Sequence, residues 1–186
     1  MSVFRALLMK LIYKDIYKII DKSMGDTQIG SRKNVNIRNH IWVVDSVICD
    51  VNSSKTKIPI DIHVYDYKQC FDSLWLKECL NDMFEGGLQN DKLNVLYSAN
   101  NLVKVVIRTP VGKTTSADIH DVIIQGDVFG GMLCSKQVDT FANECVKENK
   151  YLYNYKNEVP IPPLTMVDDV LCISECGFKT AMVNSF

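Results

Sequence analysis

The sequence predicts a mixed fold, α+β or α/β, in which helices pack on one face of an antiparallel sheet. Residues 60–67 alternate apolar and polar side chains, as a half-buried strand does. The apolar run 164–173 has Asp168 and Asp169 in its middle, which indicates a hairpin with two acids at its tip. Strand-like and helical segments alternate between these two stretches. The chain has 186 residues, of which 47% are hydrophobic, so it can bury one substantial core.

Residues 3–20 place apolar side chains on one helical face, with lysines interspersed. This pattern favours a helix that packs on the core over a helix that lies on a membrane surface. Helical spacing also covers residues 70–80, where Asp72 or Ser73 could cap the helix. The remaining patterns predict helices over about 39–51, 91–97 and 132–147, strands over 102–108 and 122–125, and a polar loop over 110–116.

Three aspartates are the strongest candidates for chemistry. Asp66 is in phase with the apolar face of its strand, so it is tolerable only where the strand ends at a cleft. Asp168 and Asp169 interrupt an apolar run, and ionised carboxylates there call for a compensating cation. A hairpin whose turn merely happens to be acidic is the alternative, but Asp-Asp is a poor two-residue turn. The pattern therefore favours a divalent metal site.

Gln125 and Gly126 follow an apolar strand pattern and precede a helical one. A glycine at such a junction lets the backbone approach a ligand closely. In isolation, a helix entry without a ligand explains this pair equally well.

Taken in order, these segments resemble the reverse transcriptase palm, above all that of non-long-terminal-repeat (LINE-type) retrotransposons. Asp66-Tyr-Lys-Gln-Cys-Phe-Asp-Ser73 is similar to the first palm motif, Gln125-Gly-Asp-Val-Phe-Gly130 to the second, and Met166-Val-Asp-Asp169 to the aromatic-x-Asp-Asp box. The segment from Gln28 to Ile41 resembles the upstream Q-x-G-x-R segment. The resemblance covers nearly the whole chain. Met166, Val128 and Cys70 depart from the residues usual in the family, but the acids are all present.

The resemblance implies an RNA-directed DNA polymerase that uses two Mg²⁺ ions, with Mn²⁺ as a substitute. Asp66 and Asp168 would be direct metal ligands, Asp169 an auxiliary acid, and the backbone carbonyl of Tyr67 a further ligand. Its substrates would be an RNA template, a DNA primer and deoxynucleoside triphosphates. The substrate-binding residues of the nucleotide pocket would be Tyr67, Phe71, Gln125 and Gly126, with Phe71 as a gate against the ribose 2′-hydroxyl. The contacts with nucleic acid would come from Gln28, Arg32, Lys33 and Arg38.

The same resemblance divides the chain into partial helical fingers at 1–58 and a palm at 59–186. The basic fingers hairpin would lie before Met1, and the thumb and endonuclease are expected to be absent. We therefore expect an incomplete polymerase that is weak or inactive alone. The alternatives are a catalytically silent remnant that at most binds nucleic acid, and a nucleotide cyclase, which the Gln-Gly and Asp-Asp elements argue against.

Composition adds bounds to this interpretation. The formal net charge of −1 argues mildly against a dedicated nucleic-acid binder, although a polymerase can separate its acids from its bases. Seven cysteines without C-x-x-C spacing favour reduced, buried thiols and hence an intracellular protein. The sequence shows no signal peptide and no membrane span.

Overall fold

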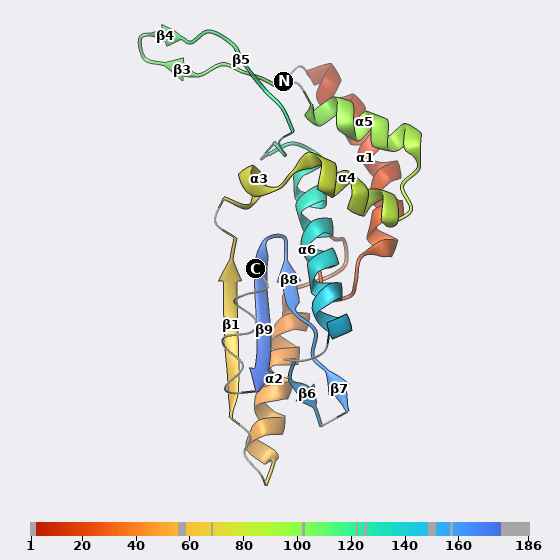
Figure 1. The fold of residues 1–186 in the computed structure, drawn as a ribbon, viewed down its shortest axis with the longest axis vertical. Helices are drawn as coiled ribbons and strands as arrows, with labels where there is room; N and C mark the ends of the chain where they lie inside the picture. The colour runs from red at the N-terminus through yellow and green to blue at the C-terminus, as the bar shows by residue number, and fades with distance from the viewer. Residues whose placement is uncertain are drawn as a thin grey trace. The chain divides into compact units, whose positions relative to one another are not determined.

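The computed structural model describes residues 3–55, 59–67, 69–101, 103–121, 123–124, 126–148, 152–156 and 158–175, without the side chains of 3–6. The chain forms two compact units, each assembled from two stretches of sequence (Figure 1). The first comprises residues 1–24 and 68–137, and the second comprises residues 25–67 and 138–186. These two units are defined by packing. The predicted division into fingers at 1–58 and a palm at 59–186 is a functional one, and it stays a prediction.

The second unit contains the predicted antiparallel sheet. Its strands are β1 (Ile60–Asp66), β8 (Leu164–Met166) and β9 (Asp169–Glu175), in the order β1-β9-β8. The central strand β9 is the most apolar, and its residues Val170, Cys172 and Ile173 are buried. β1 lies at the edge, which explains why Ile62 and Val64 keep exposed side chains. The expected half-buried strand at residue 60 is therefore present.

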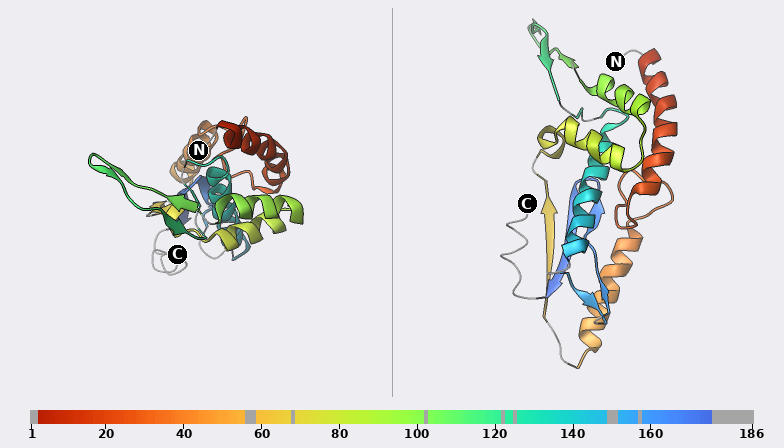
Figure 2. Two further views of the ribbon diagram at one scale, coloured as in Figure 1. Left: turned by 90° about the horizontal axis from the view of Figure 1, so that it is seen from above. Right: turned by 45° about the vertical axis from the view of Figure 1, so that its right-hand side comes forward.

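Helix α2 (Arg38–Ser53) packs on one face of this sheet (Figure 2, right). Val44, Val47 and Val51 recur at helical spacing and meet Leu171 and Ile173 in one apolar cluster. On the other face, Cys172 lies near Cys145 of α6 (Gly130–Glu148). A small hairpin of β6 (Asn154–Tyr155) and β7 (Val159–Pro160) completes the unit.

The first unit is mainly helical, with α1 (Val3–Ser23), α3 (Cys70–Ser73), α4 (Leu76–Glu85) and α5 (Asn90–Asn100). Its core includes Ile16, Ile20 and Met83, which are fully buried together with the start of α6. Lys10, Lys14, Lys18 and Lys22 of α1 are exposed. Leu7, Leu8 and Leu11 are exposed too, so only the second half of the predicted apolar face is buried.

The C-terminus of α4 shows how local sequence ends a helix. Gly87 has a φ of 95°, a conformation that glycine adopts without strain. The Gly87 N–H donates to the Phe84 carbonyl at 2.9 Å, and the Leu88 N–H donates to the Met83 carbonyl at 3.0 Å. These are the two bonds of a Schellman cap, and Leu88 and Met83 are both buried in the same core.

Short strands follow α5 in the first unit. β2 (Val103–Val105) pairs with β5 (Ala117–Ile119), and β3 (Arg108–Thr109) pairs with β4 (Gly112–Lys113). The β3–β4 hairpin projects from the helices of its own unit (Figures 1 and 2). The predicted strand 102–108 and loop 110–116 are thus parts of a hairpin. Ile123 and Ile124 do not form the strand expected over 122–125, whose end residues lie outside the described part of the chain.

No helix in the described part of the chain is long and apolar enough to cross a membrane. Helices predicted at 39–51, 91–97 and 132–147 are confirmed as α2, α5 and α6. The helix predicted over 70–80 is interrupted at Leu74 and Trp75, which are extended. Asp72 and Ser73 therefore lie inside the short α3, and the capping role predicted for them is wrong.

Candidate metal centre

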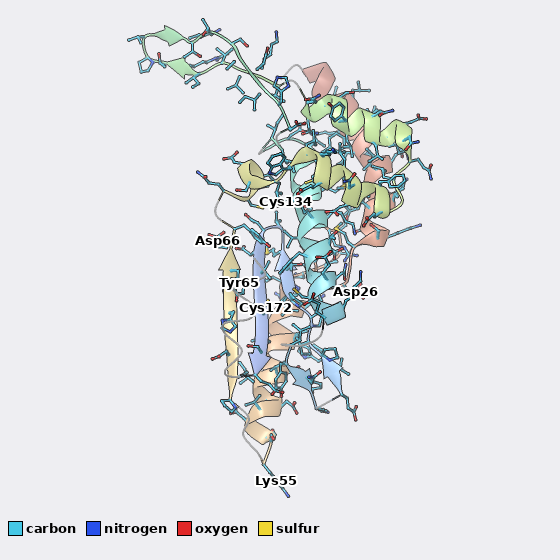
Figure 3. The ribbon with its side chains drawn as sticks, in the orientation of Figure 1. Asp26, Lys55, Tyr65, Asp66, Cys134 and Cys172 are labelled. Carbon is cyan, nitrogen blue, oxygen red and sulfur yellow. The ribbon has the colours of Figure 1, made fainter. Side chains whose placement is uncertain are left out.

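Asp66 and Asp169 lie opposite each other at the end of the sheet. They are Cα partners in the antiparallel pairing of β1 with β9. Cross-strand partners project to the same face, so the two carboxylates are neighbours. Both side chains are exposed. Figure 3 shows Asp66 at the tip of β1.

Asp168 lies in the turn that joins β8 to β9. Met166 pairs with Asp169, so the two turn residues are Val167 and Asp168, not the two aspartates. The register differs from the expected acidic turn by one residue. Paired Cα atoms are at most about 5.5 Å apart and consecutive ones about 3.8 Å, so the Cα atoms of Asp66 and Asp168 are within about 9 Å. This Cα separation is short enough for two carboxylates to share one magnesium ion, given metal–oxygen distances of about 2 Å.

The three acids repel one another. Partial burial, the charge of Asp168 and the charge of Asp66 together raise the pKa of Asp169 above its usual value. A bound divalent cation would offset this repulsion. Within the described residues, no group of three or more His, Cys, Asp or Glu side chains is arranged to hold a metal ion. Magnesium commonly takes only one or two carboxylates and completes its shell with water and substrate phosphates, so the donor set fits it.

Val167 has an unfavourable backbone conformation. Its φ is 59°, and a positive φ is rare for a β-branched residue because its Cβ crowds the backbone. Two contacts compensate for this strain. The Val167 N–H donates to Oε1 of Gln28 at 3.1 Å, and Nε2 of Gln28 donates to the Val167 carbonyl at 3.4 Å. The Gln28 side chain therefore bonds both the N–H and the carbonyl of Val167.

Gln28 is fully buried and is itself held in place. Its Oε1 also accepts a 2.7 Å hydrogen bond from the Gly30 N–H. The guanidinium of Arg32 donates to the backbone carbonyls of Gly25, at 2.7 Å, and of Gln28, at 3.2 Å. We call residues Gln28, Gly30 and Arg32 the bracket. A contact with nucleic acid, as predicted for Gln28, does not fit its burial, and Arg32 has its guanidinium on the backbone.

The backbone beside the bracket forms further bonds to β8. The Thr165 N–H donates to the Thr27 carbonyl at 3.0 Å, and the Ile29 N–H donates to the Thr165 carbonyl at 2.9 Å. Residues 27–29 therefore lie as an extra segment along the hairpin. Lys33 and Arg38 are exposed, so these two predicted contacts with nucleic acid stay open.

A mostly apolar pocket of about 490 Å³ opens beside Asp169 in the same unit. Val64, Met166 and residues of α2, among them His40 and Asp45, line it. The Thr27 carbonyl lies 2.9 Å from Nε2 of His40, and burial lowers the pKa of this imidazole. The sequence alone gave no sign of this pocket, because its lining comes from three separate segments.

The nucleotide-pocket residues belong to the first unit, except Tyr67, which directly follows β1. Phe71 is half-buried against the helical core, and its ring is near Gly130. Gly126 has a φ of 81° and open space around it, so its conformation suits glycine. Gln125 lies outside the described residues, and its predicted role stays a prediction.

No model of a known protein family matches the chain, and no curated protein matches its sequence. Solved structures of telomerase do match its fold. Apo telomerase from Candida tropicalis, truncated from its C-terminal domain, matches with a TM-score of 0.63 and 16% identity, over 94% of this chain and 36% of that one.

Two telomerase structures in complex with the TWJ fragment of telomeric RNA match as well. The Candida tropicalis protein has a TM-score of 0.61 and 18% identity, over 93% of this chain and 29% of its own. The Candida albicans protein has a TM-score of 0.58 and 14% identity, over 94% and 31%. The chain spans about a third of the length of these proteins and shares an α+β fold with the matched part of them.

Proposed function

We propose that this chain is the palm part of an RNA-directed DNA polymerase of the reverse-transcriptase kind. The observation that supports this most is the placement of Asp66 opposite Asp169, with Asp168 in the adjoining turn. The fold shared with telomerase adds to it. The likeness of the sequence motifs to those of LINE-type retrotransposons suggests that origin.

The acids would bind two magnesium ions. Asp66 and Asp168 would hold the ions through their carboxylates, and the backbone carbonyl of Tyr67 would be a further ligand. Asp169, the cross-strand partner of Asp66, would add negative charge beside them and attract the cations. When bound, magnesium lowers the pKa of a primer 3′-hydroxyl and neutralises the leaving pyrophosphate.

Substrate selection would fall to residues outside the acidic cluster. The Phe71 ring would exclude a ribose 2′-hydroxyl and so favour deoxynucleotides. Gln125 and Gly126 would line the pocket for the incoming nucleotide and the template base. The exposed Lys33 and Arg38 would contact phosphates of the RNA template or DNA primer.

The activity would belong to a larger polymerase. In nucleotidyl transfer, positioning of the duplex and the triphosphate supplies much of the catalysis. This chain corresponds to about a third of the telomerase chains, so further parts would hold the duplex. We expect the isolated chain to extend a primer weakly or not at all.

Primer extension on an RNA template by the larger polymerase tests this function. Asp66→Asn and Asp168→Asn should each abolish Mg²⁺-dependent extension, because an amide brings no charge to hold the ion. Asp61→Asn is the matched control. Asp61 lies on the same strand, but it is paired with Ser174 on the opposite face of the sheet, so this variant should extend normally.

Phe71→Ala should keep extension and increase ribonucleotide incorporation. Near-normal rates of both metal-ligand variants would show that the acids have only a structural role in the hairpin. A larger polymerase without any activity, whose variants change nothing, would instead favour a silent retrotransposon remnant.

A further inference from the structure

The acidic hairpin has a strained turn at the residue just before Asp168. Val167 has a φ of 59°, which is a strained conformation for a β-branched residue. Such a conformation persists only where the surroundings enforce it. Within the described part of the chain, the side chain that hydrogen-bonds to the Val167 backbone is that of Gln28, 139 residues away in sequence.

We propose that Gln28 is a positioning residue for the acidic hairpin: its side-chain amide fixes the Val167 peptide and thereby directs Asp168 towards Asp66. This inference rests on the proposed metal-binding function. It assigns Gln28 a role in the polymerase that does not involve contact with nucleic acid.

The contacts of Gln28 suit this role. Its Oε1 accepts from the N–H groups of Val167 and Gly30, and its Nε2 donates to the Val167 carbonyl. A side-chain amide carries an acceptor oxygen and a donor nitrogen side by side, so one group can bond both the N–H and the carbonyl of Val167. Because Gln28 is fully buried, water cannot replace these bonds when they are lost.

The rest of the bracket fixes Gln28 itself. A Cβ at position 30 would lie 2.2 Å from the Val167 nitrogen and 2.8 Å from Oε1 of Gln28, so only glycine leaves room for the contact. Arg32 holds the Gln28 carbonyl at 3.2 Å. The Q-x-G-x-R spacing is therefore explained by one structural task, which is to hold the turn before Asp168.

Two measurements on the 186-residue chain test the proposal, with Gln28→Met as the variant. Methionine keeps the length and approximate volume of the side chain but forms none of its hydrogen bonds. Amide hydrogen exchange at Val167 should accelerate by about tenfold or more, because the N–H loses its acceptor. The affinity for Mn²⁺, followed by paramagnetic broadening of the Asp168 and Asp169 amide signals, should fall about tenfold, as for other residues that orient metal ligands.

Two controls separate positioning from general loosening. The amides of Thr165 and Ile29 bond to backbone carbonyls in the same segment, so they should stay protected in Gln28→Met. Gln89→Met makes the same change at an exposed glutamine and should alter neither measurement. If Gln28→Met does not fold, Gln28→Asn serves instead, since it keeps the amide on a side chain one methylene too short.

Unchanged exchange at Val167 in the folded variant would overturn the proposal. Faster exchange with an unchanged Mn²⁺ affinity would also overturn it, because the turn would then not position the acids. If the wild-type chain shows no Mn²⁺ broadening at these acids, the proposed function fails together with the positioning role. Hydrogen exchange at Val167 in Gln28→Met distinguishes the two failures. It accelerates if only the metal site is absent, and it is unchanged if Gln28 does not hold the turn.

Discussion

Replacing Gly30 by alanine should destabilise the unit that contains the acidic hairpin by about 3–5 kcal/mol. The added Cβ would lie 2.2 Å from the Val167 nitrogen, 2.7 Å from Cγ2 of Val167 and 2.8 Å from Oε1 of Gln28. The first of these atoms belongs to the backbone of a hydrogen-bonded hairpin, so it cannot move aside cheaply. Gly30 has no positive φ, and the expected cost is therefore steric and not conformational.

The magnitude follows from two contributions. Overpacking a tight site costs typically about 1–3 kcal/mol. Displacing Val167 from Gln28 also weakens the hydrogen bonds that Oε1 accepts from Val167 and Gly30, each worth about 1 kcal/mol. For a chain of this length the melting temperature should fall by about 10 °C.

Urea unfolding followed by circular dichroism measures this loss. Gly87→Ala is the matched control, because Gly87 has a φ of 95° but its nearest atom lies 3.9 Å from the added Cβ. That variant should lose only about 1–2 kcal/mol, from backbone strain. A loss below about 0.5 kcal/mol for Gly30→Ala would refute the close packing of the bracket against the hairpin.

Two other expectations concern buried groups. Burial, then a 2.9 Å hydrogen bond to Asp50 and the charge of that carboxylate, raise the pKa of Tyr153 to about 12. Below about pH 10 the phenol is neutral in both the folded and the unfolded chain. Between about pH 10 and 12 it ionises only in the unfolded chain, so the free energy of unfolding should fall in that range. Urea unfolding of Tyr153→Phe should show a smaller fall there and a loss of about 1 kcal/mol at neutral pH; equal pH profiles would contradict this. Burial also raises the pKa of the Cys79 thiol to about 12, and this thiol donates to Oε1 of Gln137 at 2.7 Å. Iodoacetamide reacts with the thiolate, so at about pH 8 it should modify the exposed Cys49 before Cys79, as measured by mass spectrometry. Equal alkylation rates in the folded chain would contradict the burial of Cys79.

Periodicity was sufficient to predict the elements with a clear apolar pattern. Residues 60–66 alternate and form β1, and the long helical pattern near residue 132 forms α6. The predicted helix at 70–80 is interrupted because Leu74 and Trp75 are extended. The Leu76 N–H then lies 3.5 Å from the Asp121 carbonyl, a tertiary contact that helical spacing cannot reveal.

The site was predictable as a set of acids but not as a geometry. Apolar flanks identify Asp168 and Asp169, yet both possible registers of the hairpin satisfy the same pattern. The observed register puts Asp169, not Asp168, opposite Asp66. The residues of the Q-x-G-x-R segment are visible in the sequence, but their contact with Val167, 139 residues further along the chain, is not.

The location of a bound Mn²⁺ ion tests the central claim most directly, that the acids at the end of the sheet form a metal site. Mn²⁺ added to the chain with a deoxynucleoside triphosphate should broaden the amide signals around Asp66, Asp168 and Asp169 before any others. Asp66→Asn should remove this broadening, and Asp61→Asn should keep it. Broadening that is centred elsewhere, or that persists in Asp66→Asn at the same Mn²⁺ concentrations, would contradict the metal site.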